Sequence, residues 1–401
     1  MDTPKRGRVE GPLAPYAAGL WEELVGRSYA ARSAETHLLL MGRLSRWLEQ
    51  TGLDLSALGP VQVDEFLTWN RAGVRRFPKS TQGAAPLLEF LRRVGVVPMP
   101  PVQLLSPTEE LLERLRVYLG RERGLAEGTI YNYVHAGRLF LRALESAGGL
   151  DLEGLSTTDV NSFVVAECRG RSIAASKNLV NGLRSLLCFL YVEGITSVPL
   201  SGAVPTVSGW SGGGLPRGVD ATSVRRLLAS CDRRTAKGRR DFAILTLLSR
   251  LGLRAGEVVA LDLDDIDWSR AVVLVRGKAN RLERLPLPTD VGKALEGYLI
   301  RGRPPGEGRA LFLRVLAPHR RITKGAVNVI VHAACERASL APMAPHRLRH
   351  TVASELLRRG AGLAEIGQLL RHRSAAVTSI YAKVDTVPLR QLARPWPGSV
   401  S

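Results

Sequence analysis

Helical periodicity dominates the N-terminal half of the chain. In Thr36–Gln50 the apolar residues recur at three- and four-residue steps, which places them on one helix face. The stretch Thr51–Leu58 breaks this pattern, Val61–Asn70 resumes it, and Pro86–Val94 is a further segment with one apolar face. The pattern predicts a helical bundle, preceded by a loose arm at residues 1–26 with room for one short helix.

The same order of segments occurs a second time. Gly42–Leu67 aligns with Gly137–Val164, and Leu87–Leu91 aligns with Leu186–Leu190. The offset grows slowly along the alignment, as small loop insertions after a duplication would produce. Two amphipathic bundles can also look alike by composition, but the preserved order favours duplication. Each copy is then a bundle of about four helices, at residues 27–100 and 105–205.

A stretch rich in glycine, serine and proline, Val198–Asp220, follows the second bundle. Its glycines are not followed by the GK[ST] of a phosphate-binding loop, and no strand precedes them. We interpret it as a hinge and place the linker between domains at residues 206–220.

The third block, residues 221–385, mixes helices with a hairpin. Two short strand-like runs, Ala271–Arg276 and Leu282–Leu287, flank a polar turn, which is typical of a β-hairpin. The remaining apolar-faced segments predict helices at Val224–Ser230, Arg239–Leu251, Gly325–Ala338, His346–Arg359, Leu363–Arg371 and Ala375–Val384. A proline-containing tail, residues 386–401, ends the chain. The predicted fold class is mainly α with a small β-sheet, an α+β arrangement.

Composition narrows the function. Of 401 residues 45% are hydrophobic, enough for packed cores in about two to four domains. The formal net charge of +19 indicates a polyanionic partner, most commonly nucleic acid. An anionic membrane surface would also fit this charge, but no apolar run approaches the roughly 20 residues that span a bilayer. The start lacks the apolar core of a signal peptide, and four scattered cysteines form no CxxC. We therefore expect a cytoplasmic, nucleoid-associated protein.

Six polar side chains in the third block could carry chemistry: Arg254, Lys278, His346, Arg349, His372 and Tyr381. Taken singly, most of them have an ordinary structural interpretation. Arg254 has Glu257 three residues away as an ion-pair partner, and Lys278 lies in a turn. Arg349 lies in an otherwise apolar-faced segment, where a guanidinium binds either a carboxylate or a phosphate. His346 precedes Arg349 by three residues, so both lie on one side of a helix.

Taken together, these side chains form a set that phosphoryl transfer can use. Fixed cations stabilise the negative charge that builds on the phosphate oxygens. A tyrosine hydroxyl can attack phosphorus and hold it covalently. A lysine or histidine can protonate the departing oxygen. No cluster of Asp or Glu indicates a metal site, and we expect no cofactor.

Three motifs make a family resemblance specific. HRLRHTVASELLRRG (His346–Gly360), followed by LLRHRSAAVTSIYAKV (Leu369–Val384), resembles the signature of the tyrosine recombinases, the phage integrase and XerC/XerD-like family. GLRAGEV (Gly252–Val258) resembles their first arginine box, and GKANRLERLPLP (Gly277–Pro288) resembles their lysine hairpin. The resemblance implies an integrase-like catalytic domain at residues 221–385 and SAM-like helical domains before it, of which 105–205 is the core-binding domain.

The resemblance also implies roles for the site residues. Arg254 and Arg349 would clamp the scissile phosphate, and Tyr381 would be the nucleophile that forms a 3′-phosphotyrosyl bond. Lys278 would be the general acid. The two histidines would assist, His346 by activating Tyr381 or contacting the phosphate and His372 by donating to a non-bridging oxygen, while Glu257 would support the site. Arg371 departs from the pattern, because the family commonly has glycine there, and it would alter the helix end or add a phosphate contact.

The family works on double-stranded DNA as a tetramer, so the resemblance implies a DNA-bound homotetramer that acts as a site-specific recombinase of the integrase or transposase type, with the direction of the reaction and the kind of mobile element or chromosomal role left open. A partner recombinase or an accessory DNA-bending protein could take part. The tail would dock on a neighbouring subunit or be a disordered end, and the first repeat would bind DNA or be a spacer.

Three alternatives stay open on the sequence. A type IB topoisomerase or hairpin resolvase would use the same chemistry. A catalytically inactive DNA-binding regulator could share the fold, although it would have no need of Tyr381. A generic basic RNA-binding protein lacks support, since aromatic residues make up only 5% of the chain.

Overall fold

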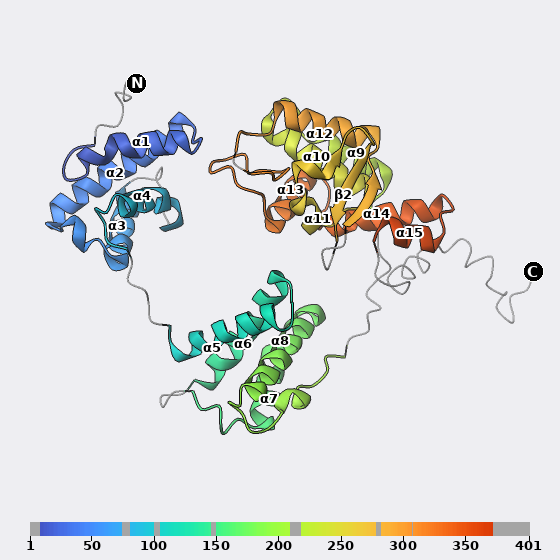
Figure 1. Cartoon of the computed structure of the whole chain (residues 1–401), viewed down its shortest axis with the longest axis horizontal. Coiled ribbons are helices and arrows are strands. Elements are labelled where there is room, and N and C mark those ends of the chain that lie inside the picture. The colour runs from blue at the N-terminus through green and yellow to red at the C-terminus, as the bar shows by residue number, and fades with distance from the viewer. Residues whose placement is uncertain are drawn as a thin grey trace, which may run out of the picture. The chain divides into compact units, whose positions relative to one another are not determined.

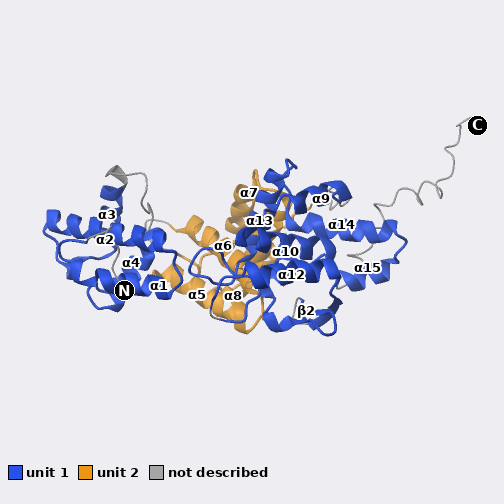
Figure 2. Ribbon diagram, turned by 90° about the horizontal axis from the view of Figure 1, so that it is seen from above, with its two compact units in different colours: residues 1–100, 214–401 blue, residues 101–213 orange. Residues whose placement is uncertain are grey.

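Helices make up most of the structure, a computed structural model (Figure 1). The described residues are 9–73, 81–99, 105–145, 150–208, 218–277, 282–306 and 308–371. The chain divides into two compact units, residues 101–213, and residues 1–100 together with 214–401 (Figure 2). Buried apolar side chains gather in three main clusters, within residues 9–97, 111–204 and 219–348.

The N-terminal bundle contains more of the chain than the pattern predicted. Its elements are η1 (Ala14–Tyr16), α1 (Ala17–Gly26), α2 (Ala31–Thr51), η2 (Leu55–Ala57), α3 (Pro60–Gly73) and α4 (Thr81–Arg93). Within it, Leu13, Leu20 and Leu24 are fully buried, and the Leu13 N–H donates to Ser45 Oγ at 3.1 Å. The one short helix expected in the arm is present as α1, but residues 9–26 are not a loose arm, because they pack into the bundle core. Proline and glycine suggested an irregular segment, but the apolar residues that lie between them pack into the core of the N-terminal bundle.

The second bundle comprises α5 (Pro107–Arg121), α6 (Glu127–Leu144), α7 (Thr157–Cys168), α8 (Ile173–Val192) and η3 (Leu200–Ala203). Helices α6 and α8 approach closely at Gly182, where an added Cβ would lie 2.7 Å from Ala136. In both bundles an aspartate of an LDL sequence forms a turn before the next helix. Asp54 accepts from the Ser56 N–H, and Asp151 accepts from the Glu153 N–H.

The stretch interpreted as a hinge is partly built into the cores on either side. Leu200 and Val204 are buried in the second bundle, and Arg184 donates to the Val204 carbonyl at 2.9 Å. Val219 is buried in the third cluster and donates to Thr351 Oγ1 at 2.8 Å. The prediction of a hinge over the whole of Val198–Asp220 is thus wrong at both ends, because apolar residues there are buried in the neighbouring cores.

The third block consists of helices and a three-stranded antiparallel sheet. Its helices are α9 (Ala221–Ala229), α10 (Ala236–Arg250), α11 (Ala255–Ala260), α12 (Thr289–Arg301), α13 (Lys324–Arg337), α14 (Pro345–Arg358) and α15 (Leu363–Leu369), with η4 (Leu263–Asp265). The sheet order is β1 (Ile266–Asp267), β2 (Val272–Arg276) and β3 (Leu282–Pro286). Val272 pairs with Pro286 and Arg276 with Leu282, which confirms the predicted hairpin. The fold class, mainly α with a small sheet, is confirmed.

Helix α10 is the centre of this block. Its residues from Ala243 to Leu248 are all buried, and it contacts α9, α11, α12, α13 and α14. A helix segment surrounded on all sides is hydrophobic all round, which explains the mostly apolar run from Ala243 to Leu248. Its C-terminal end leads into the Gly252 turn, where the candidate site begins.

Candidate active site

The Gly252 turn joins the first arginine box to α14. Gly252 has a φ of +59°, and an added Cβ would lie 2.7 Å from the Leu370 side chain, so glycine is required twice over. The Gly252 carbonyl accepts a hydrogen bond from Arg349 Nη1 at 2.6 Å. Arg349 is 1% exposed, so its charge lies under the surface next to this turn.

Arg254 stands at the N-cap of α11. Its backbone N–H donates to Glu257 Oε2 at 2.8 Å, and its Nη1 donates to Glu257 Oε1 at 2.6 Å. The Arg254 side chain is 40% exposed while that of Glu257 is 4% exposed. A carboxylate in the first turn of a helix is also favoured by the unpaired N–H groups there. The buried Glu257 carboxylate therefore holds the Arg254 guanidinium on its inner side, and part of the Arg254 guanidinium stays accessible to solvent.

Arg371 completes this group from the other end of the sequence. Its Nη2 donates to Glu257 Oε2 at 2.7 Å, and its own carbonyl accepts from Arg254 Nη2 at 3.2 Å. The Arg371 side chain is 2% exposed. Its φ of +55° lies in the left-handed region, which disfavours a residue with a Cβ by about 1–2 kcal/mol. This is the conformation that glycine commonly adopts after a helix C-cap, so Arg371 keeps the backbone of the family pattern and the expected change of the helix end is not seen. The Arg371 guanidinium is bonded to the Glu257 carboxylate, which already provides it with an anionic partner.

The charge of Glu257 is fixed by these two arginines. Burial alone would raise the pKa of this carboxyl group, but the Arg371 charge and the hydrogen bonds from Arg254 and Arg371 outweigh it. The pKa of Glu257 is therefore lowered, and the group is a carboxylate at neutral pH. Because Glu257 is shared by Arg254 and Arg371, the three side chains together carry a net positive charge. Arg254 is the exposed member of the three.

Two histidines lie one turn apart on α14. The His346 and His350 rings are T-shaped with centroids 4.3 Å apart. Partial burial of the ring lowers the pKa of His346, and the charges of Arg349 and Arg254 lower it further. Burial, His346 and Arg349 lower the pKa of His350 to about 4. Both rings are therefore neutral at neutral pH, and His346, which keeps an exposed edge, can accept a proton.

The structure thus brings together Arg254, Glu257, His346 and Arg349 of the predicted site. Lys278, His372 and Tyr381 lie outside the described residues, as do Ala375–Val384 and the tail. Strands β2 and β3 flank Lys278 in the chain, and Arg371 directly precedes His372. Sequence reasoning missed that Arg371 joins the ion-pair group, since the signal for it was only an arginine where the family pattern has glycine.

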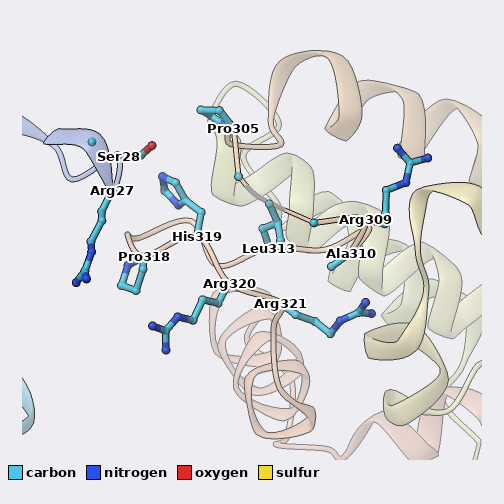
Figure 3. A pocket seen from close by; sticks show the side chains of 13 residues that line it. Arg27, Ser28, Pro305, Arg309, Ala310, Leu313, Pro318, His319, Arg320 and Arg321 are labelled. Atoms are coloured by element: carbon cyan, nitrogen blue, oxygen red, sulfur yellow. The ribbon is translucent and has the colours of Figure 1, made fainter. Parts of the chain in front are cut away.

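A basic loop braces the far end of α11. Arg321 donates to the Val259 carbonyl at 2.7 Å and to the Leu261 carbonyl at 3.3 Å, next to its ion pair with Asp262. Figure 3 shows Arg320 and Arg321 extending from this loop in different directions. By holding the last carbonyls of α11, Arg321 fixes the helix whose first residues position Arg254.

The described part of the chain contains neither a candidate membrane span nor a candidate metal site. None of the helices there has the length and apolar character of a membrane-crossing segment. Within the same residues, no group of three or more His, Cys, Asp or Glu side chains is placed to hold a metal ion.

The chain has a mainly helical fold with a small antiparallel sheet and a paired-arginine site, and sequence comparison identifies the family. The chain belongs to the phage integrase family, that of the tyrosine recombinases. The family's catalytic model matches residues 218–387, and its N-terminal SAM-like domain model matches residues 112–194.

Individual relatives agree with this assignment. An integrase/recombinase of Sinorhizobium fredii is 39% identical over 97% of this chain and 96% of its own length. The tyrosine recombinase XerD of Mycobacterium tuberculosis is 34% identical over 70% of this chain and 94% of its own length. Among solved structures, XerH bound to its difH substrate shares the fold with a TM-score of 0.57 at 18% identity, covering 82% of this chain and 93% of that one.

Proposed function

We propose that this protein is a site-specific DNA recombinase that cleaves and rejoins DNA strands through a 3′-phosphotyrosyl intermediate at Tyr381. One observation carries the proposal. Arg254 and Arg349, nearly a hundred residues apart in sequence, are joined through the Gly252 turn, with His346 close enough for both arginines to depress its pKa. Two guanidinium groups beside a neutral imidazole suit a phosphodiester whose oxygens gain negative charge during displacement.

In the proposed step the Tyr381 oxygen attacks the phosphorus of the scissile phosphodiester and loses its proton, with the neutral His346 as acceptor. The bond between phosphorus and the 5′ oxygen breaks, and Lys278 gives that oxygen a proton. The product is a 3′-phosphotyrosyl bond and a free 5′ hydroxyl. The hydroxyl of another strand reverses the step and completes the exchange, so no external energy source is needed.

In this step Arg254 and Arg349 bind the non-bridging oxygens, and His372 donates to one of them. Arg349 is held rigidly by its buried position and its bond to Gly252, while Arg254 presents an exposed edge. Preorganised donors of this kind stabilise the transition state because they need no rearrangement when the charge appears. Glu257 acts indirectly, by orienting Arg254.

The proposed substrate is double-stranded DNA, and the proposed working form is a tetramer on two duplexes. The net charge of +19 supports phosphate contacts and a strong salt dependence of binding. The same fold, at 16% identity and a TM-score of 0.52, occurs in the crystal structure of a lambda integrase tetramer bound to a Holliday junction. Exchange of strands between two duplexes requires an active site for each strand that is cut.

The test compares exchange with relaxation. Covalent complexes trapped on genomic DNA would be sequenced to find the cleavage site, and a supercoiled plasmid would be built with two copies of that site. The proposal expects recombinant circles whose junctions fall at the site. Relaxed topoisomers without recombinants would instead assign a topoisomerase activity, and DNA binding without any covalent complex would assign a regulator.

A further inference from the structure

Arg371 is the one buried cation of the described site that the proposed chemistry does not use. It follows the last turn of α15 and reaches a group that begins more than a hundred residues earlier, at Arg254. Both contacts it makes there involve the same pair, Arg254 and Glu257. Its left-handed backbone turns its carbonyl toward Arg254, and its guanidinium lies on Glu257.

We propose that Arg371 is a positioning residue for Arg254, which it holds directly through its carbonyl and indirectly through Glu257. This inference rests on the proposed function, since it assigns Arg254 to the phosphate.

Two contacts at its two terminal nitrogens fix the Arg254 side chain. Nη1 is held by Glu257 and Nη2 by the Arg371 carbonyl, so the two terminal nitrogens have different anchors. A guanidinium held at both terminal nitrogens cannot rotate without breaking one bond. The Glu257 carboxylate is held in turn by the Arg371 guanidinium and by the Arg254 backbone N–H. Removing Arg371 would leave the carboxylate anchored only by the residue that it is meant to orient.

Arg371 also affects how much positive charge Arg254 offers to a phosphate. With Arg371 present, Glu257 neutralises only part of each guanidinium. With Arg371 removed, Glu257 and Arg254 form a one-to-one pair, and the positive charge available to a phosphate decreases. The cations that remain near this group are Arg349 of α14, bonded to the Gly252 carbonyl, Lys324 of α13, whose side chain packs on Gly256, and His346 of α14 when protonated.

The experiment uses the full chain and a library of nicked duplexes with a randomised centre, on which covalent adducts accumulate because the cleaved strand end is lost. We expect Arg371→Met to slow adduct formation about tenfold, as a small misplacement of a catalytic group does, while DNA affinity stays within about twofold. Arg371→Lys keeps the charge on Glu257 and should recover most of the rate. Arg371→Gly relieves the left-handed backbone but removes the charge, so its rate should stay as low as that of Arg371→Met.

A pH profile separates positioning from plain stability. In Arg371→Met the pKa of Glu257 should rise, so the acid limb of the adduct-forming rate should move to higher pH. The matched control is Arg240→Met in α10, because Arg240 is also a buried arginine, paired with Asp241 at 2.7 Å and remote from these contacts. It should lower the melting temperature and leave the pH profile in place. Wild-type rates and profiles in both Arg371→Gly and Arg371→Met would overturn the inference.

Failure of the proposed function would be seen separately. If the wild-type chain formed no adduct with the library, the recombinase proposal would fail. The positioning role would then be decided by carboxyl-carbon NMR of labelled Glu257 in the full chain. An unchanged titration of Glu257 between wild type and Arg371→Met would contradict it, and a titration moved to higher pH would support it.

Discussion

His350 lies half-buried on α14 beside His346 and Arg349, and replacing it with glutamine should change how stability depends on pH. Its pKa in the folded protein is about 4, against 6.5 for an ordinary histidine, because burial and the two neighbours disfavour its charged form. The unfolded chain therefore binds more protons than the folded chain between these values. The wild type should lose stability as the pH falls through this window, and His350→Gln should lose less.

The size of the effect follows from the two pKa values. At about 1.4 kcal/mol per unit of pKa, the difference sets an upper limit of about 3 kcal/mol over the whole window. Between about pH 7 and about pH 5 the same linkage gives about 2 kcal/mol. The ring is partly exposed, and screening by water reduces the expected change to roughly 1 kcal/mol.

The assay is hydrogen exchange in α14 peptides of the full chain at increasing urea, corrected for the intrinsic effect of pH on exchange. It reports opening of this helix, so the other parts of the chain do not enter the measurement. His332→Gln serves as the control, since it removes an exposed histidine of α13. Equal losses of stability on acidification in wild type and His350→Gln would refute the reasoning.

The remaining predictions concern catalysis. Lys278→Ala should slow cleavage and spare affinity, and a substrate with a sulfur at the 5′ bridging position should restore the rate, because that leaving group needs no proton; absence of rescue would place the general acid elsewhere. Arg349→Lys should lower the cleavage rate about 100-fold with DNA binding retained, because lysine carries its donors on one nitrogen and lacks the planar fork that would reach both the Gly252 carbonyl and the phosphate; a rate near wild type would remove Arg349 from the clamp. Deletion of residues 1–100 should alter site choice or assembly more than cleavage, and loss of all cleavage on a nicked substrate would show that this segment belongs to the catalytic unit.

Much of the fold was readable because most of its elements are strongly periodic. The hairpin came from two short runs around a polar turn, and α14 came from the apolar residues between His346 and Arg359. Strand β1 was missed because two residues carry no period. The buried stripe of Leu13, Leu20 and Leu24 was missed because proline and glycine around it suggested an irregular arm.

Part of the site could likewise be predicted from the sequence and part could not. Local motifs predicted Arg254, His346 and Arg349, and the structure brings them together around the Gly252 turn. The part played by Arg371 could not be read from the sequence, since its contacts with Glu257 and Arg254 span more than a hundred residues and its left-handed backbone is set by the end of α15. Burial and charge at one position depend on the fold around it, and a single sequence does not give that.

The central claim is that a tyrosine hydroxyl takes over the DNA phosphate, and peptide mapping of the covalent complex tests it most directly. The full chain would be trapped on nicked duplex DNA and digested with protease and nuclease, and the modified peptide would be sequenced by mass spectrometry. The account predicts a 3′-phosphonucleotide on Tyr381 and no adduct from Tyr381→Phe, which should still bind DNA. A nucleotide on any other side chain, or an adduct that survives Tyr381→Phe, would contradict it.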